Sequence, residues 1–194
     1  MMGVNYVGHF LLTVLLLDKL SRCPDGPARV INIVCGSCKK GNLANLWNLE
    51  GQRDGNYSFR HHYHNSKLAQ YIFTKELSRR FRSVGILAFA VNPGLVSSGL
   101  YKALKGISGQ LTQICAKVLY RTPEEGIQTI LHCLLAKGIE PNSGALFRDC
   151  RVQDINVPKW DDQVAKELWE NTCRLIKQKG IPITLKENDD EGIS

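Results

Sequence analysis

The 194-residue sequence predicts an α/β fold with a largely parallel sheet. Two short runs, residues 28–34 and 86–91, have the length and the β-branched or apolar character of strands, and the second lacks polar alternation, as is typical of a strand covered on both faces. A long amphipathic segment, residues 60–84, separates these runs, and another helical segment precedes the first. Alternation of helix and strand indicates parallel neighbours, because parallel strands need a crossover connection.

Composition indicates an ordinary globular protein. Hydrophobic residues make up 43% of the chain and charged residues 22%, and the length suits one domain. The formal net charge is +7, but the basic residues are scattered. They do not form the basic stripe of a nucleic-acid interface, and suit an anionic cofactor or a membrane surface instead. We expect one domain over residues 1–185 and a polar, acidic, disordered tail over residues 186–194.

The first predicted helix covers residues 4–22. Its apolar stretch is too short to span a bilayer and is not followed by a signal-peptide cleavage pattern, so we expect a buried helix. A proline- and glycine-rich breaker, residues 23–27, ends it. The β-branched run at residues 28–34 is the first predicted strand. The polar stretch of residues 36–60 that follows is long for a loop, and such loops are often functional.

The second predicted helix covers residues 60–84. Its apolar residues recur near helical spacing (Leu68, Ile72, Leu77 and Phe81). Gly85 stands where a C-cap glycine is expected. The strand of residues 86–91 follows and is stopped by the turn of residues 92–94.

Three more elements are predicted toward the C-terminus. Residues 100–119 read as a helix broken by two glycines, and residues 122–125 form a capping box that opens a helix to about residue 136. Residues 144–147 are a short last strand. Residues 160–179 are a final amphipathic helix.

The most informative motif is Tyr63-His64-Asn65-Ser66-Lys67. A tyrosine and a lysine at this spacing lie on the same face of a helix. A nearby ammonium favours the phenolate, which lowers the pKa of a tyrosine from its ordinary value of about 10. Such a tyrosine can move a proton to or from an alcohol oxygen. The alternative is an amphipathic helix with a solvated lysine.

The seven cysteines are odd in number and irregularly spaced, which indicates a reducing compartment and mostly unpaired thiols. Cys35 and Cys38 form one C-x-x-C, but no second pair supports a zinc site. A thioredoxin-like redox pair would have to open a helix after a strand, whereas Gly36 and residues 39–41 favour a loop, so we expect neither a metal nor a redox function of this pair. The histidines at positions 61, 62 and 64 point in different directions on a helix, so we expect no metal site.

Four segments in this order resemble one known family: VNYVGHFLLT at residues 4–13, RVINI at 29–33, the Tyr63-x-x-x-Lys67 motif, and Asn-Pro-Gly at 92–94. The chain resembles the C-terminal two-thirds of a short-chain dehydrogenase/reductase, in the branch of the retinol dehydrogenases and the X-linked dehydrogenase/reductase. The resemblance implies a Rossmann-like, doubly wound, mostly parallel sheet whose first strands lie outside this sequence. It also implies an N-terminally truncated domain and hydride transfer between NAD or NADP and an alcohol or carbonyl.

The resemblance implies catalytic roles for five residues. Tyr63 is the acid/base, and Lys67 lowers its pKa and bonds the nicotinamide ribose. Asn5 holds a water for proton relay. Cys35 takes the place of a serine that polarises the substrate oxygen. A thiol is a weak donor, and Ser37, two residues on, is the alternative.

The resemblance also implies a cofactor-binding segment after the second strand. Pro93, Gly94 and Val96 belong to the turn beside the nicotinamide, and Ser98 bonds the carboxamide. The nucleotide half of the family's site, a G-x-G-x-x-G turn after a strand, has no counterpart in the sequence. Preference for NAD or NADP therefore stays open.

The resembled branch implies a hydrophobic substrate, that is, a retinoid-, prenol- or steroid-like alcohol, aldehyde or ketone. It implies self-association through the helices that begin at residues 4 and 60. It also implies an intracellular location, cytoplasmic or on the cytosolic face of the endoplasmic reticulum. Two other functions remain open: a non-catalytic binding or regulatory partner, and a peripheral membrane protein.

Overall fold

The computed structural model describes residues 1–42, 44, 58–97 and 120–183. Within these ranges the sheet has the strand order β1 (Ala28–Ile33), β2 (Ile86–Val91), β3 (Leu146–Arg148), β4 (Arg151–Val152). The first three strands are parallel, and β4 runs antiparallel to β3. The prediction of a mostly parallel α/β sheet is confirmed.

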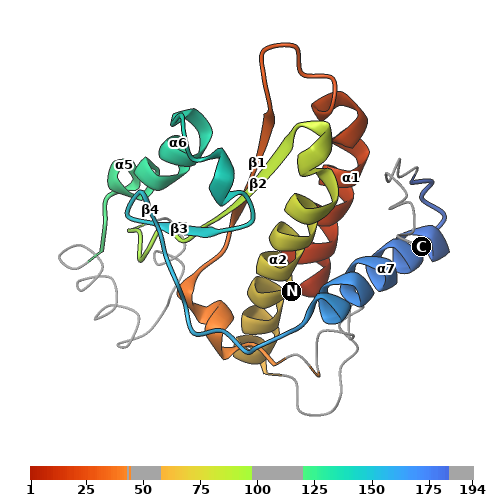
Figure 1. The fold of residues 1–194 in the computed structure, drawn as a ribbon. Helices are drawn as coiled ribbons and strands as arrows, with labels where there is room; N and C mark the ends of the chain where they lie inside the picture. Colours follow the sequence, from red (N-terminus) through yellow and green to blue (C-terminus); the bar gives the residue numbers. More distant parts are fainter. Residues whose placement is uncertain (43, 45–57, 98–119, 184–194) are drawn as a thin grey trace.

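Helices cover both faces of this sheet. In Figure 1, α1 (Gly8–Leu20), α2 (Phe59–Phe81) and α7 (Asp162–Gln178) lie to one side of the strands. On the other side lie α5 (Pro123–Gly126) and α6 (Gln128–Leu135). None of the helices among the described residues combines the length and apolar character that a membrane span requires.

Strand β2 is covered on both faces, which explains why its sequence lacks polar alternation. All six residues are buried. Ile86 and Ala88 belong to the core between the sheet and the three-helix side, whereas Leu87, Phe89 and Val91 belong to the core under α6. Because successive side chains point to opposite faces, a strand covered on both faces must be apolar throughout.

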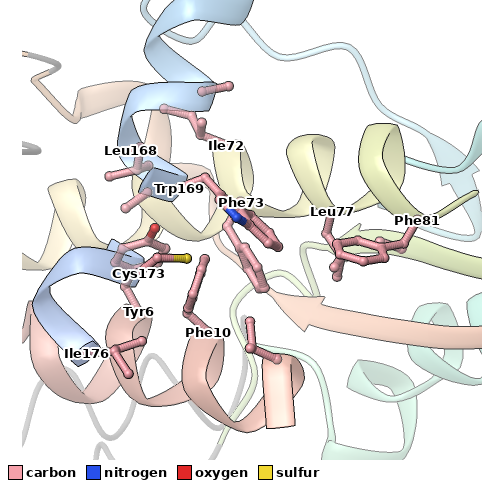
Figure 2. Close-up of a cluster of buried hydrophobic side chains, with 14 of the residues drawn as sticks. Tyr6, Phe10, Ile72, Phe73, Leu77, Phe81, Leu168, Trp169, Cys173 and Ile176 are labelled. Atoms are coloured by element: carbon pink, nitrogen blue, oxygen red, sulfur yellow. The ribbon is translucent and has the colours of Figure 1, made fainter. Parts of the chain in front are cut away.

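Aromatic side chains hold α1, α2 and α7 together, as Figure 2 shows. Phe10 of α1 lies 4.7 Å from Trp169 of α7, centroid to centroid, and Phe73 of α2 stacks on the same indole at 5.8 Å. Tyr6 joins them through a hydrogen bond of 2.8 Å between its hydroxyl and that of Thr172. Every ring of this cluster is buried, so α7 closes the core over α1 and α2.

The first helix differs from its prediction. Residues 3–7 form a π-helix, η1 (Gly3–Val7), before α1 begins. The Gly8 amide donates to the Gly3 carbonyl across this wide turn, and a Cβ at Gly8 would lie only 3.3 Å from that oxygen. Single π-turns inside helices are frequent at functional sites, and this one contains Asn5.

The helix expected over residues 123–136 is also interrupted. Its capping box is present, with Thr122 and Glu125 bonding each other's backbone amides, but the helix breaks at Ile127 into α5 and α6. Gly126 packs so closely on Val96 that an added Cβ would lie 2.6 Å from a Val96 methyl. The segment after β2 therefore packs directly against the chain next to this break.

A tight turn of two residues connects the end of β3 to β4. Both residues have positive φ, 54° at Asp149 and 59° at Cys150. Strand β4 was not predicted, because two residues give no periodic signal. The helix expected over residues 100–119 and the tail of residues 186–194 lie outside the described residues.

The remaining short helices are 3-10 turns: η2 (Gly36–Lys40), η4 (Arg82–Val84) and η5 (Glu140–Asn142). Gly85 follows η4 with φ +81°, which confirms its prediction as a capping glycine.

Candidate active site

The candidate site lies where β1 and β2 end. The two strands are parallel and in register, from Ala28 beside Ile86 to Ile33 beside Val91, so their carboxyl ends meet at one edge. The loops that follow adjoin, since a Cβ at Gly36 would lie 3.8 Å from the amide nitrogen of the Asn92 side chain. Ligands of open α/β sheets bind outside this edge.

Cys35, Ser37 and Tyr63 form one cluster at this edge. The Cys35 Sγ lies 3.5 Å from the Tyr63 hydroxyl oxygen and 2.6 Å from the Ser37 Oγ. Cys35 has extended backbone and directly precedes η2, so the chain turns here and brings both side chains toward α2. The structure thus places Cys35 beside the predicted acid/base and Ser37 beside Cys35.

Lys67 lies one helical turn after Tyr63 and reaches the end of β1. Its Nζ donates to the Ile33 carbonyl at 2.8 Å and to the Gln70 Oε1 at 3.1 Å. Burial lowers the pKa of the Lys67 ammonium, while the nearby Cys35 and Cys38 thiols act in the opposite direction. These two acceptors use two of the three ammonium hydrogens.

Asn5 contacts the helical turn that carries Tyr63. Its Nδ2 donates to the Ser66 Oγ at 3.1 Å, and that hydroxyl donates to the Tyr63 carbonyl at 2.8 Å. Asn5 is therefore tied to the helical turn that carries the tyrosine. Asn5 belongs to η1, which contacts α2.

The segment after β2 is fastened in a tight turn. The Gly94 amide donates to the Asn92 Oδ1 at 3.1 Å, and Gly94 has φ +81°, a conformation that glycine adopts without strain. Arg121 lies over this turn, since a Cβ at Gly94 would be 3.2 Å from its Nε, and it also reaches the Pro93 carbonyl. The turn is thereby held against the chain that leads into α5.

Val96 continues this segment and forms a parallel backbone bridge with Arg121. Its methyls pack on Gly126, as described above. Ser98, the predicted carboxamide ligand, lies outside the described residues.

Positive charge surrounds the start of α2. The pKa of His64 is lowered, first by burial and then by the charges of Lys40, His61 and Arg60.

Sequence reasoning missed Gln70. This side chain is fully buried, accepts from Lys67 and lies 3.4 Å from the His9 Nδ1 through its amide nitrogen. The sequence did contain a signal for Gln70. It is a polar residue on the predicted buried face of an amphipathic helix, one turn after the motif lysine, and buried polar groups need a hydrogen-bond partner.

Comparison with known proteins gives a consistent set of relatives. The chain is 38% identical to mouse retinol dehydrogenase 11 over 181 residues, which is 93% of this chain and 54% of that protein. It is 37% identical to human retinol dehydrogenase 12 over 177 residues, 90% of this chain and 53% of that protein. It is 35% identical to bovine dehydrogenase/reductase SDR family member 13 over 178 residues, 90% of this chain and 46% of that protein. The chain therefore spans about half the length of the curated relatives it matches.

Solved structures show the same fold. A putative uncharacterized protein from Mycobacterium paratuberculosis matches with a TM-score of 0.58 and 25% identity, over 95% of this chain and 60% of that one. An NADPH-bound carbonyl reductase from chicken fatty liver matches with a TM-score of 0.54 and 19% identity, over 78% of this chain and 54% of that one. No family model matches the sequence.

Proposed function

Because the chain belongs to the short-chain dehydrogenase/reductase family, we propose that it carries the proton-transfer and substrate side of an NAD(P)-dependent oxidoreductase. The proposed substrate is a hydrophobic alcohol, aldehyde or ketone of retinoid, prenol or steroid type. Relatives named retinol dehydrogenases support the retinoid class first.

One observation carries this proposal. The Tyr63 hydroxyl and the Cys35 thiol lie 3.5 Å apart beside the end of β1, and Lys67 is anchored to that same strand end. A phenol, a second hydrogen-bond donor and an ammonium that converge on one edge of a parallel sheet suit proton transfer to a substrate oxygen.

In carbonyl reduction, the Tyr63 hydroxyl donates its proton to the substrate oxygen, and in alcohol oxidation it takes the proton back. The Lys67 charge stabilises the phenolate left after donation. Cys35 or Ser37 donates a second hydrogen bond to the same oxygen. Bound nicotinamide supplies or accepts the hydride.

The donor set fits the nicotinamide end of such a cofactor. The Lys67 ammonium donates two of its hydrogens to the Ile33 carbonyl and the Gln70 side chain. Its third hydrogen can donate to a ribose hydroxyl of the cofactor. The turn at Pro93 and Gly94 lies at the same sheet edge and would border the ring. The sequence holds no G-x-G-x-x-G turn after a strand, so the fit extends to the nicotinamide end alone.

Cys35 supports a second candidate function, that of a non-catalytic partner of another protein. A thiol is a weak hydrogen-bond donor and would stabilise a developing oxyanion poorly. Such a protein would keep the fold of the site but would not catalyse the oxidation or reduction of a substrate.

Titration of the full chain with NADPH and NADH, followed by fluorescence, separates the two candidates. We expect micromolar binding for the enzyme, weakened by Lys67→Met and unchanged by Lys166→Met, which alters an exposed lysine on α7. All-trans-retinal, farnesal and a 3-ketosteroid then serve as probes of turnover. Absence of binding up to millimolar cofactor would favour the non-catalytic partner.

A further inference from the structure

We propose that Cys35 and Cys38 form a reversible disulfide that disconnects the thiol of Cys35 from the candidate site. The formation of this bond does not depend on the proposed reaction. Its effect on turnover does rest on the proposed function.

The backbone brings the two cysteines within reach of each other. The Cys38 amide donates to the Cys35 carbonyl at 3.0 Å, which closes a four-residue turn at the start of η2. Such a turn holds its first and last Cα atoms within about 7 Å, and disulfides span about 4.4–6.8 Å between Cα atoms.

The surroundings of the two thiols show that they share one environment. Cys38 interacts electrostatically with Cys35, and Lys67 interacts with both thiols. Neither Cys35 nor Cys38 takes part in a disulfide with another cysteine in the described part of the chain.

The two cysteines differ in access to solvent. Cys35 is half-buried and its sulfur contacts Ser37 and Tyr63, whereas Cys38 is fully buried in the core under η2. Burial raises the pKa of the Cys38 thiol to about 11. Cys35 is therefore the sulfur that meets an oxidant first, and Cys38 is the slower, resolving thiol.

Hydrogen peroxide is a sufficient oxidant. In the first step the Cys35 sulfur attacks one peroxide oxygen, the O–O bond breaks, and sulfenic acid and one water form. In the second step the Cys38 sulfur, having lost its proton, attacks the Cys35 sulfur. The S–S bond forms, the S–O bond breaks, and a second water leaves. A dithiol returns both thiols and is itself oxidised.

The disulfide changes the site because the Cys35 sulfur that bonds Cys38 is the same sulfur that contacts the Tyr63 hydroxyl. In the disulfide, the Cys35 sulfur has lost its hydrogen and can no longer donate to the Tyr63 hydroxyl. The oxidised protein then lacks the thiol beside the tyrosine, while η2 keeps its packing on α2 through Gly41 and Leu68.

Peptide mass measurement on the full chain tests the proposal. The protein is treated with peroxide, alkylated under denaturing conditions and cut with trypsin, which releases both cysteines in one peptide from Val30 to Lys39 or Lys40. We expect this peptide to become two hydrogens lighter, to resist alkylation and to regain both thiols with dithiothreitol. Cys38→Ala should instead leave a sulfenic acid on Cys35 that dimedone traps, and Cys150→Ser, the matched control, should behave as wild type.

A peptide that keeps two alkylatable thiols, or a Cys35 linked to another cysteine or another chain, would overturn the proposal. The readout needs no cofactor or turnover. Linkage without cofactor binding would leave this inference standing and remove the proposed function, and turnover without linkage would do the reverse.

Discussion

At the scale of single residues, the proposed reaction depends on Cys35. It stands where the family resemblance implies a serine, 3.5 Å from the Tyr63 hydroxyl and 2.6 Å from Ser37. Ser37 contacts Cys35, so it can act on the substrate oxygen only through Cys35 unless the first turn of η2 shifts. The chemistry of the site therefore depends on whether a thiol or a hydroxyl faces the tyrosine.

Replacing Cys35 by serine should raise turnover of retinal at least about tenfold, because one oxyanion donor contributes about 10²–10³ in rate and a hydroxyl donates more strongly than a thiol. Steady-state rates with NADPH measure the effect. Cys150→Ser should leave the rate unchanged. A Cys35→Ser rate equal to that of wild type would assign the donor role to Ser37.

Replacing Tyr63 by phenylalanine should lower turnover by about 10²–10⁴, the usual contribution of a positioned acid/base. Cofactor affinity should remain, because Lys67 keeps its contacts with Ile33 and Gln70. The control is Tyr71→Phe in the same helix. Burial raises the pKa of Tyr71 to about 12, and its ring packs on Trp160. Equal rates for the two variants would contradict the assignment of Tyr63.

At the scale of elements, α2 joins the site to the core and carries a buried ionic cluster. The Glu76 carboxylate is 2% exposed and accepts hydrogen bonds from Arg79 and Arg80 at 2.6–2.8 Å. The Arg80 guanidinium also lies 4.9 Å from the centre of the Trp169 ring. Burial by itself would raise the pKa of Glu76, but the two guanidinium groups outweigh it, and the pKa is lowered.

Glu76→Gln should therefore lower the free energy of unfolding by about 1–3 kcal/mol at pH 7. Because the folded-state pKa is lowered, the stabilisation is complete above the ordinary value of 4.5 and is lost as the pH falls through the folded-state pKa. Urea unfolding of both proteins from pH 7 to pH 3 should show the difference shrinking toward acid pH. Glu170→Gln, at an exposed position on α7, should change stability by less than about 0.5 kcal/mol. A difference that is constant with pH would rule out the ionic explanation.

At the scale of the whole molecule, one aromatic core joins segments from both ends of the described chain. Tyr6 and Phe10 near the N-terminus meet Trp169 and Thr172 of α7, with Phe73 between them. The position of the site depends on this core, because α2 carries Tyr63 and Lys67 at one end and Phe73 in the middle.

Trp169→Ala should lower the free energy of unfolding by about 3–5 kcal/mol, as is usual when a large buried aromatic side chain is truncated. Trp160, which is only partly buried and packs on Tyr71, provides the control, and Trp160→Ala should cost less. Thermal unfolding followed by circular dichroism measures both. Equal losses would show that α7 does not close the core as described.

The sequence by itself determined the features that depend on local interactions. The apolar run of β2, the capping box at Thr122 and the capping glycine Gly85 all appear where they were predicted, because each is specified by neighbouring residues. The Tyr63-x-x-x-Lys67 spacing likewise placed both side chains on one helix. Their catalytic roles remain predictions.

Only the tertiary structure decided which distant residues meet. The contact of Cys35 with Tyr63, the anchoring of Lys67 on Ile33 and the bond from Asn5 to Ser66 join residues far apart in the sequence. The contact of Gly126 with Val96 beside the break before α6 and the pairing of the two-residue strand β4 with β3 likewise join separate segments. Local propensity contains no information on these pairings, because they arise only when β1, β2 and the helices pack into one sheet and one core.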